Sequence, residues 1–89
     1  MSTKIIDPMT PAQCRAARAL LEITQSQLAD AAGLGLSTVV DFEKERRQVS
    51  ADAVKAIRNA LVRAGIAFTN EGAFGQGVML RKPRHSRKK

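Results

Sequence analysis

The residues best suited to binding chemistry lie between Thr24 and Arg47. Gln25 stands at the start of a predicted helix, where unpaired backbone N–H groups and the helix dipole favour an anion. Arg46 and Arg47 follow in the same stretch, and guanidinium groups pair well with phosphate oxygens. The alternative is that Gln25 only begins the helix and that the two arginines form a solvated cluster with neighbouring acids. The chemistry expected here is noncovalent recognition of an anion.

Residues for bond-making chemistry are scarce. Cys14 falls on the inner face of a predicted helix, which indicates a small core residue. His85, the single histidine, has no neighbouring base or metal-ligand partner in the sequence. No Cys/His cluster has metal-ligand spacing, and no glycine motif has the strand-then-helix context of a phosphate loop. The sequence therefore predicts neither an enzyme nor a metal or cofactor.

Two short helices joined by a glycine turn position the binding residues. Thr24 and Gln27 have the spacing of a capping box, and Gly33 suits a helix end with positive φ. A second helix begins at Leu36. The residues expected to face inward are Leu28, Ala29 and Ala32 in the first of these helices and Val39 and Phe42 in the second. This arrangement is typical of a DNA-binding helix-turn-helix.

Two further helices complete the predicted core. Thr10 caps one that starts at Pro11 and runs to about Leu21. Ser50 caps another from Ala51 to about Ala64, which Gly65 ends. Their inner faces carry Cys14, Ala17 and Leu21 in the first and Val54, Ile57 and Leu61 in the second. The predicted fold is an all-α core, a compact four-helix bundle containing the helix-turn-helix.

The chain divides into four parts: a flexible leader at 1–9, the helical domain at 10–65, a β-hairpin at 66–81 and a basic tail at 82–89. The hairpin strands are predicted at Ile66–Thr69 and Val78–Arg81 around a turn-rich segment. An isolated two-stranded hairpin is marginal in water. It is expected either to join a second copy of the chain or to fold back on its own fourth helix. In the first case Ile66, Phe68, Val78 and Leu80 are the dimerisation residues.

The basic charge is concentrated at one end of the chain. The net charge is +7, and residues 81–89 carry six Lys or Arg, leaving nine basic and eight acidic residues elsewhere. A tail of this composition is expected to be disordered, serving either as a solubilising polycation or as an arm on nucleic acid. No apolar run reaches the roughly 18 residues of a membrane span, and a single Cys excludes an internal disulfide. A bacterial-type cytoplasmic protein is expected, nucleoid-associated when bound to DNA.

Residues 10–61 resemble the Cro/cI (XRE-like) family of helix-turn-helix regulators. The residues that carry the resemblance are Arg18, Thr24-Gln25, Leu28-Ala29, Gly33, Ser37-Thr38-Val39, Phe42-Glu43 and Arg46-Arg47. The order and spacing of these residues fit the family.

The resemblance implies a recognition helix at about 36–43 in the major groove. Its base-contacting residues would be Leu36, Ser37, Val40 and Asp41. The implied phosphate contacts are Thr24, Gln25, Gly35, Thr38, Arg46 and Arg47. It also implies that Arg18 and Glu43 form a structural ion pair that holds this helix on the scaffold.

The family pattern is not matched everywhere. Glu45 stands where a Gly or Asn commonly follows the recognition helix, and Gly35 replaces the usual Ser or Thr cap. Asp41, Glu43 and Glu45 make the end of that helix acidic, which opposes phosphate binding.

Two functions therefore compete. The first is a repressor that binds an inverted-repeat operator in double-stranded DNA as a homodimer. The second is an antitoxin- or antiactivator-like module that binds a partner protein through Leu36, Val40 and the acidic helix end. RNA or single-strand binding is disfavoured, because it requires stacking aromatic side chains and the chain has only three Phe as its aromatic residues.

Overall fold

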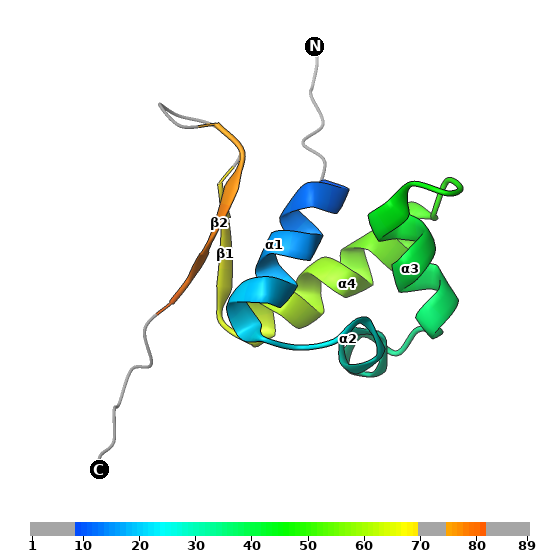
Figure 1. Ribbon diagram of the computed structural model, residues 1–89, viewed down its shortest axis with the longest axis horizontal. Coiled ribbons are helices and arrows are strands. Elements are labelled where there is room, and N and C mark those ends of the chain that lie inside the picture. The colour runs from blue at the N-terminus through cyan, green and yellow to red at the C-terminus, as the bar shows by residue number, and fades with distance from the viewer. Residues whose placement is uncertain (1–8, 70–74, 82–89) are drawn as a thin grey trace.

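Four helices and one hairpin make up the computed structural model, which describes residues 9–69 and 75–81 (Figure 1). The elements are α1 (Pro11–Leu21), α2 (Gln25–Ala32), α3 (Leu36–Lys44), α4 (Ala51–Arg63), β1 (Ile66–Thr69) and β2 (Gly77–Leu80). The predicted four-helix core and hairpin are thus confirmed. The expectations for the leader up to residue 8, for residues 70–74 and for the tail at 82–89, with His85, lie outside the described residues.

Side-chain caps fix where the helices begin. Thr10 Oγ1 accepts from Gln13 N at 3.1 Å, and Gln13 Oε1 accepts from Thr10 N at 2.9 Å. Thr24 and Gln27 repeat this capping box before α2, with distances of 3.0 and 2.9 Å. These bonds satisfy backbone donors that have no partner within the helix, so each helix starts at one defined residue.

Left-handed residues end the first three helices. Gly33 ends α2 with φ of 72°, as its freedom at positive φ predicts. Glu22 ends α1 with φ of 59°, and Glu45 ends α3 with φ of 56°. A residue with a Cβ pays steric strain in this region, so both glutamates hold an unfavourable backbone conformation.

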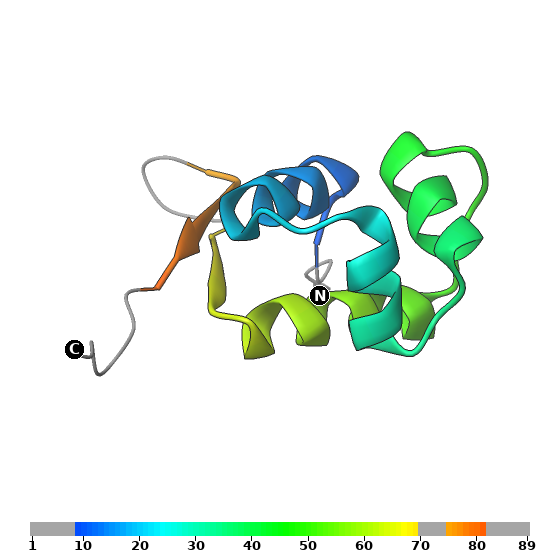
Figure 2. The same cartoon turned by 60° about the horizontal axis from the view of Figure 1, so that its bottom comes forward.

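The core lies where α1, α2, α3 and α4 converge (Figures 1 and 2). Its buried apolar residues are Met9, Cys14, Ala17, Leu28, Ala29, Val39, Val54, Ile57, Ala60, Leu61 and Ile66. The inner faces predicted from helical spacing all contribute to it, with Leu21, Ala32 and Phe42 half-buried at its margin. Met9 was expected in a flexible leader, but it is buried and extends the core beyond the start of α1.

The hairpin packs against its own chain. Ile66 is buried in the core, and Gln13 Nε2 on α1 donates to the Thr69 and Gly77 carbonyl oxygens, both at 3.0 Å. On the α4 side, the Arg58 guanidinium lies 5.0 Å from the centre of the Phe68 ring. The strands are antiparallel, and β2 begins at Gly77, one residue before the predicted start. In both views the hairpin lies at the opposite end of the molecule from α3 (Figures 1 and 2).

The strained end of α1 gives a first prediction. Positive φ costs a residue with a Cβ about 1–2 kcal/mol, and Gly avoids this strain. Gly also loses more conformational entropy on folding, which offsets roughly 0.5–1 kcal/mol of the gain. We therefore expect Glu22→Gly to raise the free energy of unfolding by up to about 1 kcal/mol, a rise in melting temperature of a few degrees. Thermal melts followed by circular dichroism measure it.

Glu22→Ala is the matched control, because it removes the same exposed carboxylate and keeps the Cβ. A Glu22→Gly protein that melted no higher than Glu22→Ala would show that this helix end is not strained.

Candidate nucleic-acid interface

α2 and α3 form the helix-turn-helix. α2 ends at Gly33, whose N–H donates to Asp30 O at 3.2 Å, and Leu34 N donates to Ala29 O at 2.9 Å. These two bonds close the turn, and Gly35 then starts α3 without a side-chain cap. Because the turn is hydrogen-bonded at the end of α2, the direction in which α3 leaves is fixed.

One side of α3 is buried and the other is open. Val39 and Glu43 face inward and are fully buried. The predicted base-contacting residues lie on the other side: Leu36 is 48% exposed, Ser37 is exposed, and Val40 and Asp41 are partly exposed. The nine-residue helix therefore offers a continuous outer face about 13 Å long for contact with another molecule.

Lys44 belongs to this outer face and was not predicted. It is exposed and follows Val40 by four residues and Ser37 by seven, so all three share one side of the helix. The spacing alone could have identified it. Lys44 adds a positive charge to the end of α3, where Asp41, Glu43 and Glu45 are acidic.

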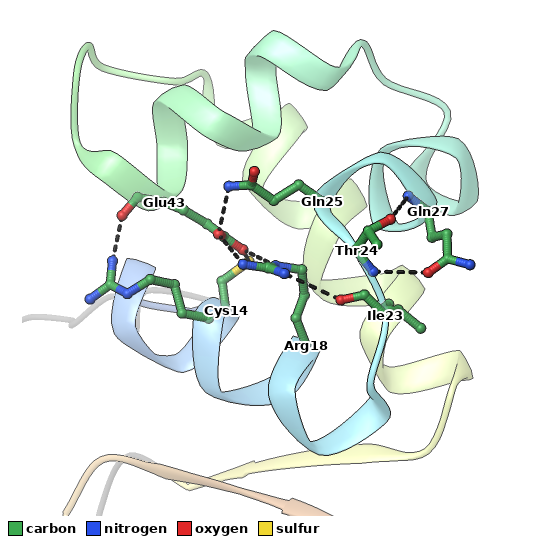
Figure 3. Close-up of polar contacts among 8 residues, drawn as sticks. Cys14, Arg18, Ile23, Thr24, Gln25, Gln27 and Glu43 are labelled. Atoms are coloured by element: carbon green, nitrogen blue, oxygen red, sulfur yellow. Dashed lines mark hydrogen bonds and ion pairs between the residues drawn. The ribbon is translucent and has the colours of Figure 1, made fainter.

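The Glu43 carboxylate is the centre of a buried polar cluster (Figure 3). Arg18 donates to both of its oxygens, from Nε to Oε2 at 2.7 Å and from Nη2 to Oε1 at 2.8 Å. Gln25 Nε2 donates to Oε1 at 3.0 Å, and the Cys14 thiol donates to Oε2, with 3.1 Å between sulfur and oxygen. Four donors fill the four acceptor sites of a carboxylate, so this buried charge is fully hydrogen-bonded.

The cluster joins three helices. Cys14 and Arg18 lie on α1, Gln25 begins α2, and Glu43 lies near the end of α3. Arg18 Nη1 also donates to Ile23 O at 3.2 Å, which holds the segment between α1 and α2. Arg15 donates to the Glu43 backbone carbonyl. α3 is thus tied to α1 and α2 through one residue, Glu43.

The cluster changes the expected roles of two residues. Gln25 was expected to clamp a phosphate, and the structure instead directs its amide N–H at Glu43. Cys14 was expected to be only a small core residue, and it also donates a hydrogen bond. Its spacing of four residues from Arg18 was the available signal, because it places both side chains on one face of α1.

The protonation states follow from these contacts. Burial favours a higher pKa for Glu43, but hydrogen bonds from Arg18, Cys14 and Gln25 and the Arg18 charge outweigh it and lower the pKa below its ordinary value. The hydrogen bond to Glu43 raises the pKa of Arg18. Burial, together with the Glu43 carboxylate, raises the pKa of the Cys14 thiol far above its usual range. At neutral pH the cluster contains a carboxylate, a guanidinium and a neutral thiol.

A second ion pair lies at the surface. Arg47 Nε donates to Asp41 Oδ2 at 2.8 Å, linking the loop after α3 back to its outer face. Arg46 is exposed beside it. Two residues that were predicted to contact DNA separately, a base for Asp41 and a phosphate for Arg47, are therefore bound to each other.

The remaining predicted phosphate-contacting residues surround the starts of α2 and α3. Thr24 is exposed and caps α2. Gly35 is exposed, and Thr38 is half-buried in the first turn of α3. Within residues 9–69 and 75–81, no group of three His, Cys, Asp or Glu side chains could hold a metal ion. None of the helices described there is long and apolar enough to span a membrane.

Loss of the Glu43 carboxylate should destabilise the fold. Glu43→Ala leaves the Arg18 charge without its partner, and breaking a buried pair in this way costs about 3–5 kcal/mol. We expect a fall of that size in the free energy of unfolding, measured by urea denaturation, with DNA binding lost as a consequence. Glu45→Ala, the same change at an exposed site in the same segment, should stay within about 0.5 kcal/mol of wild type. Unchanged stability of Glu43→Ala with lost binding would contradict a structural role.

The lowered pKa of Glu43 predicts how its contribution depends on pH. Since the folded pKa lies below the unfolded value of about 4.3, the stabilisation is complete above that pH and disappears as pH falls through the folded pKa. The difference in free energy of unfolding between wild type and Glu43→Gln should be constant near neutral pH and shrink below about pH 4. Denaturation at a series of pH values tests this. A difference that persisted in strong acid would show that the charge is not its source.

Comparison with known proteins agrees with this architecture. A model of the helix-turn-helix family matches residues 15–61, more than half of the chain. The match includes all of α2 and α3 with most of α1 and α4. A search of curated proteins gives no match to the sequence. From this match and the geometry of α2 and α3, the chain belongs to the Cro/cI-like, XRE family of helix-turn-helix DNA-binding regulators.

Proposed function

We propose that this regulator is a repressor that binds an inverted-repeat operator as a homodimer, with α3 in the major groove. The observation that carries the proposal is the division of α3 into a buried side held by Glu43 and an outer side on which Leu36, Ser37 and Lys44 are exposed. A recognition helix needs both properties, because it must project from the scaffold and keep one orientation while it reads bases. Binding to chromosomal DNA would place the protein in the cytoplasm, at the nucleoid.

The base contacts would come from the outer face of α3. Leu36 and Val40 would cover thymine methyl groups, and Ser37 would donate to or accept from a base edge. Asp41 would accept from a cytosine amino group through Oδ1, because its other carboxylate oxygen, Oδ2, already accepts from Arg47.

The phosphate contacts would come from the starts of α2 and α3 and from the loop beyond α3. Gly35 offers no side-chain cap, so the first backbone N–H groups of α3 remain available to an anion. Thr24 and Thr38 would add hydroxyl donors at these helix starts, and Arg46 would add charge. Gln25 would act mainly through its backbone N–H, because its side-chain amide binds Glu43.

The dimer contact would form along the outer edge of β2. Arg81 N donates to Gly65 O at 2.8 Å, and hydrogen-bonded pairs alternate along an antiparallel ladder. The backbone N–H and C=O groups of Val78 and Leu80 therefore point away from β1. Such an edge favours pairing with another strand, and an antiparallel pair of β2 strands has the two-fold symmetry of an inverted repeat.

The side chains available for this contact differ from the predicted set. Ile66 is buried in its own core, and Phe68 and Val78 pack against it, which leaves Leu80 from the original four. The large exposed apolar residues in this part of the molecule are Leu20 on α1 and Met79 and Leu80 on β2, at 42%, 54% and 45% exposure. We propose that these three contribute the apolar contacts of the dimer interface, with Leu80 on the same face of the hairpin as the buried Ile66 and Met79 on the opposite face.

Binding of the purified protein to its own upstream DNA, near physiological salt and with excess random duplex, tests the function. We expect retention at nanomolar protein and a footprint of two half-sites whose centres lie about one helical turn, or a multiple of it, apart. Val40→Ala should lower the free-energy preference for thymine at the contacted position by about 1 kcal/mol, because it removes methyl groups that would cover the thymine methyl.

Val62→Ala on α4 is the matched control, because it removes the same methyl groups from a half-buried side chain away from α3. Binding that disappeared with competitor would contradict a sequence-specific repressor and would favour a protein partner on the Leu36 and Val40 surface.

A further inference from the structure

The outer face of α3 lacks a strong base reader. Leu36 and Val40 make no hydrogen bonds through their side chains, Ser37 discriminates weakly, and Asp41 only accepts. Lys44, at the last position of α3, carries an ammonium, which is a point charge without the planar fork of a guanidinium. The most selective contact, a planar guanidinium on guanine O6 and N7, cannot come from the helix itself.

Arg47 lies beside this face. Its Nε donates to Asp41 Oδ2 at 2.8 Å, and Asp41 lies one helical turn after Ser37 on the same side of α3. The Arg47 side chain is 52% exposed and that of Asp41 20%. Within the described residues, neither Nη of Arg47 makes a hydrogen bond. The ion pair therefore holds the stem of the guanidinium and leaves its two outer nitrogens open.

We propose that Arg47 reads a guanine in each half-site and that Asp41 is the positioning residue that holds it there. This proposal rests on the proposed function, since it requires α3 in the major groove. A guanidinium fixed through Nε presents its Nη donors as a rigid fork, which matches the two acceptors on the guanine edge. Holding the side chain before contact reduces the ordering cost of binding.

The charge of the pair favours a base over a phosphate. The Asp41 carboxylate neutralises much of the Arg47 charge and repels a phosphate brought to the same place. Guanine O6 and N7 carry no net charge, so an Asp–Arg pair approaches them without this penalty. Arg46, which makes no ion pair among the described residues, is better suited to the phosphate contact.

The test compares variants on a set of duplexes. The preferred operator of the wild-type protein is first selected from random duplexes, and each position is then replaced in turn, including 7-deazaguanine for guanine. Arg47→Ala should reduce discrimination at one guanine position per half-site by on the order of ten- to a hundredfold, and 7-deazaguanine there should then have no further effect. Asp41→Asn should weaken preference at the same position.

Two further variants separate the base role from a phosphate role. Arg46→Ala should weaken binding to all sequences equally and reduce the salt slope by about 1. Arg47→Lys should keep the salt slope of wild type without restoring the guanine preference, because an ammonium lacks the fork. Circular dichroism confirms that these surface variants are folded.

The proposal is overturned if Arg47→Ala weakens all sequences equally with a reduced salt slope while Asp41→Asn tightens binding to all of them. Arg47 would then be a phosphate contact that Asp41 restrains. A wild-type protein with no sequence preference would instead overturn the proposed function itself, so the two failures are distinguishable.

Discussion

A single buried carboxylate fixes how the recognition helix sits on this protein. Glu43 accepts four hydrogen bonds from two other helices, so α3 cannot rotate or slide without breaking several of them together. In an interior of low dielectric constant, a carboxylate that loses its hydrogen-bond donors has a high free energy. Other orientations of α3 are therefore strongly disfavoured. The same requirement accounts for Cys14 and Gln25. Their thiol and amide donors fill the acceptor sites on Glu43 that Arg18 leaves open.

The surface ion pair changes the electrostatics of α3. From the sequence, Asp41, Glu43 and Glu45 make its end acidic, which opposes contact with a polyanion. In the folded protein Glu43 is buried and paired with Arg18, and Asp41 is paired with Arg47. Glu45 is then the acid of this group without an ion pair among the described residues. The conflict between the acidic helix and a DNA-binding family is resolved by where the charges lie.

Most of the fold could be predicted from residues close together in the sequence, whereas contacts between distant segments could not. Capping residues such as Thr24 and the spacing of apolar residues on each helix gave the helix boundaries and the core, because both depend on neighbours within a turn or two. The aim of Gln25 at Glu43, the thiol donor of Cys14 and the burial of Met9 depend on segments far apart in the chain. The hairpin is intermediate: its strands were predictable, but its attachment through Gln13 was not.

The two-sided character of α3 has a consequence for how such a protein diversifies. Its outer residues are Leu36, Ser37, Val40, Asp41 and Lys44, and none of them is buried in the core, while Val39 and Glu43 supply the buried contacts and Phe42 packs against the core. Substitutions on the outer face should therefore change what is recognised at little cost in folding. Gene duplication could thus yield paralogues with different targets on one unchanged scaffold, provided that the polar cluster around Glu43 is inherited whole.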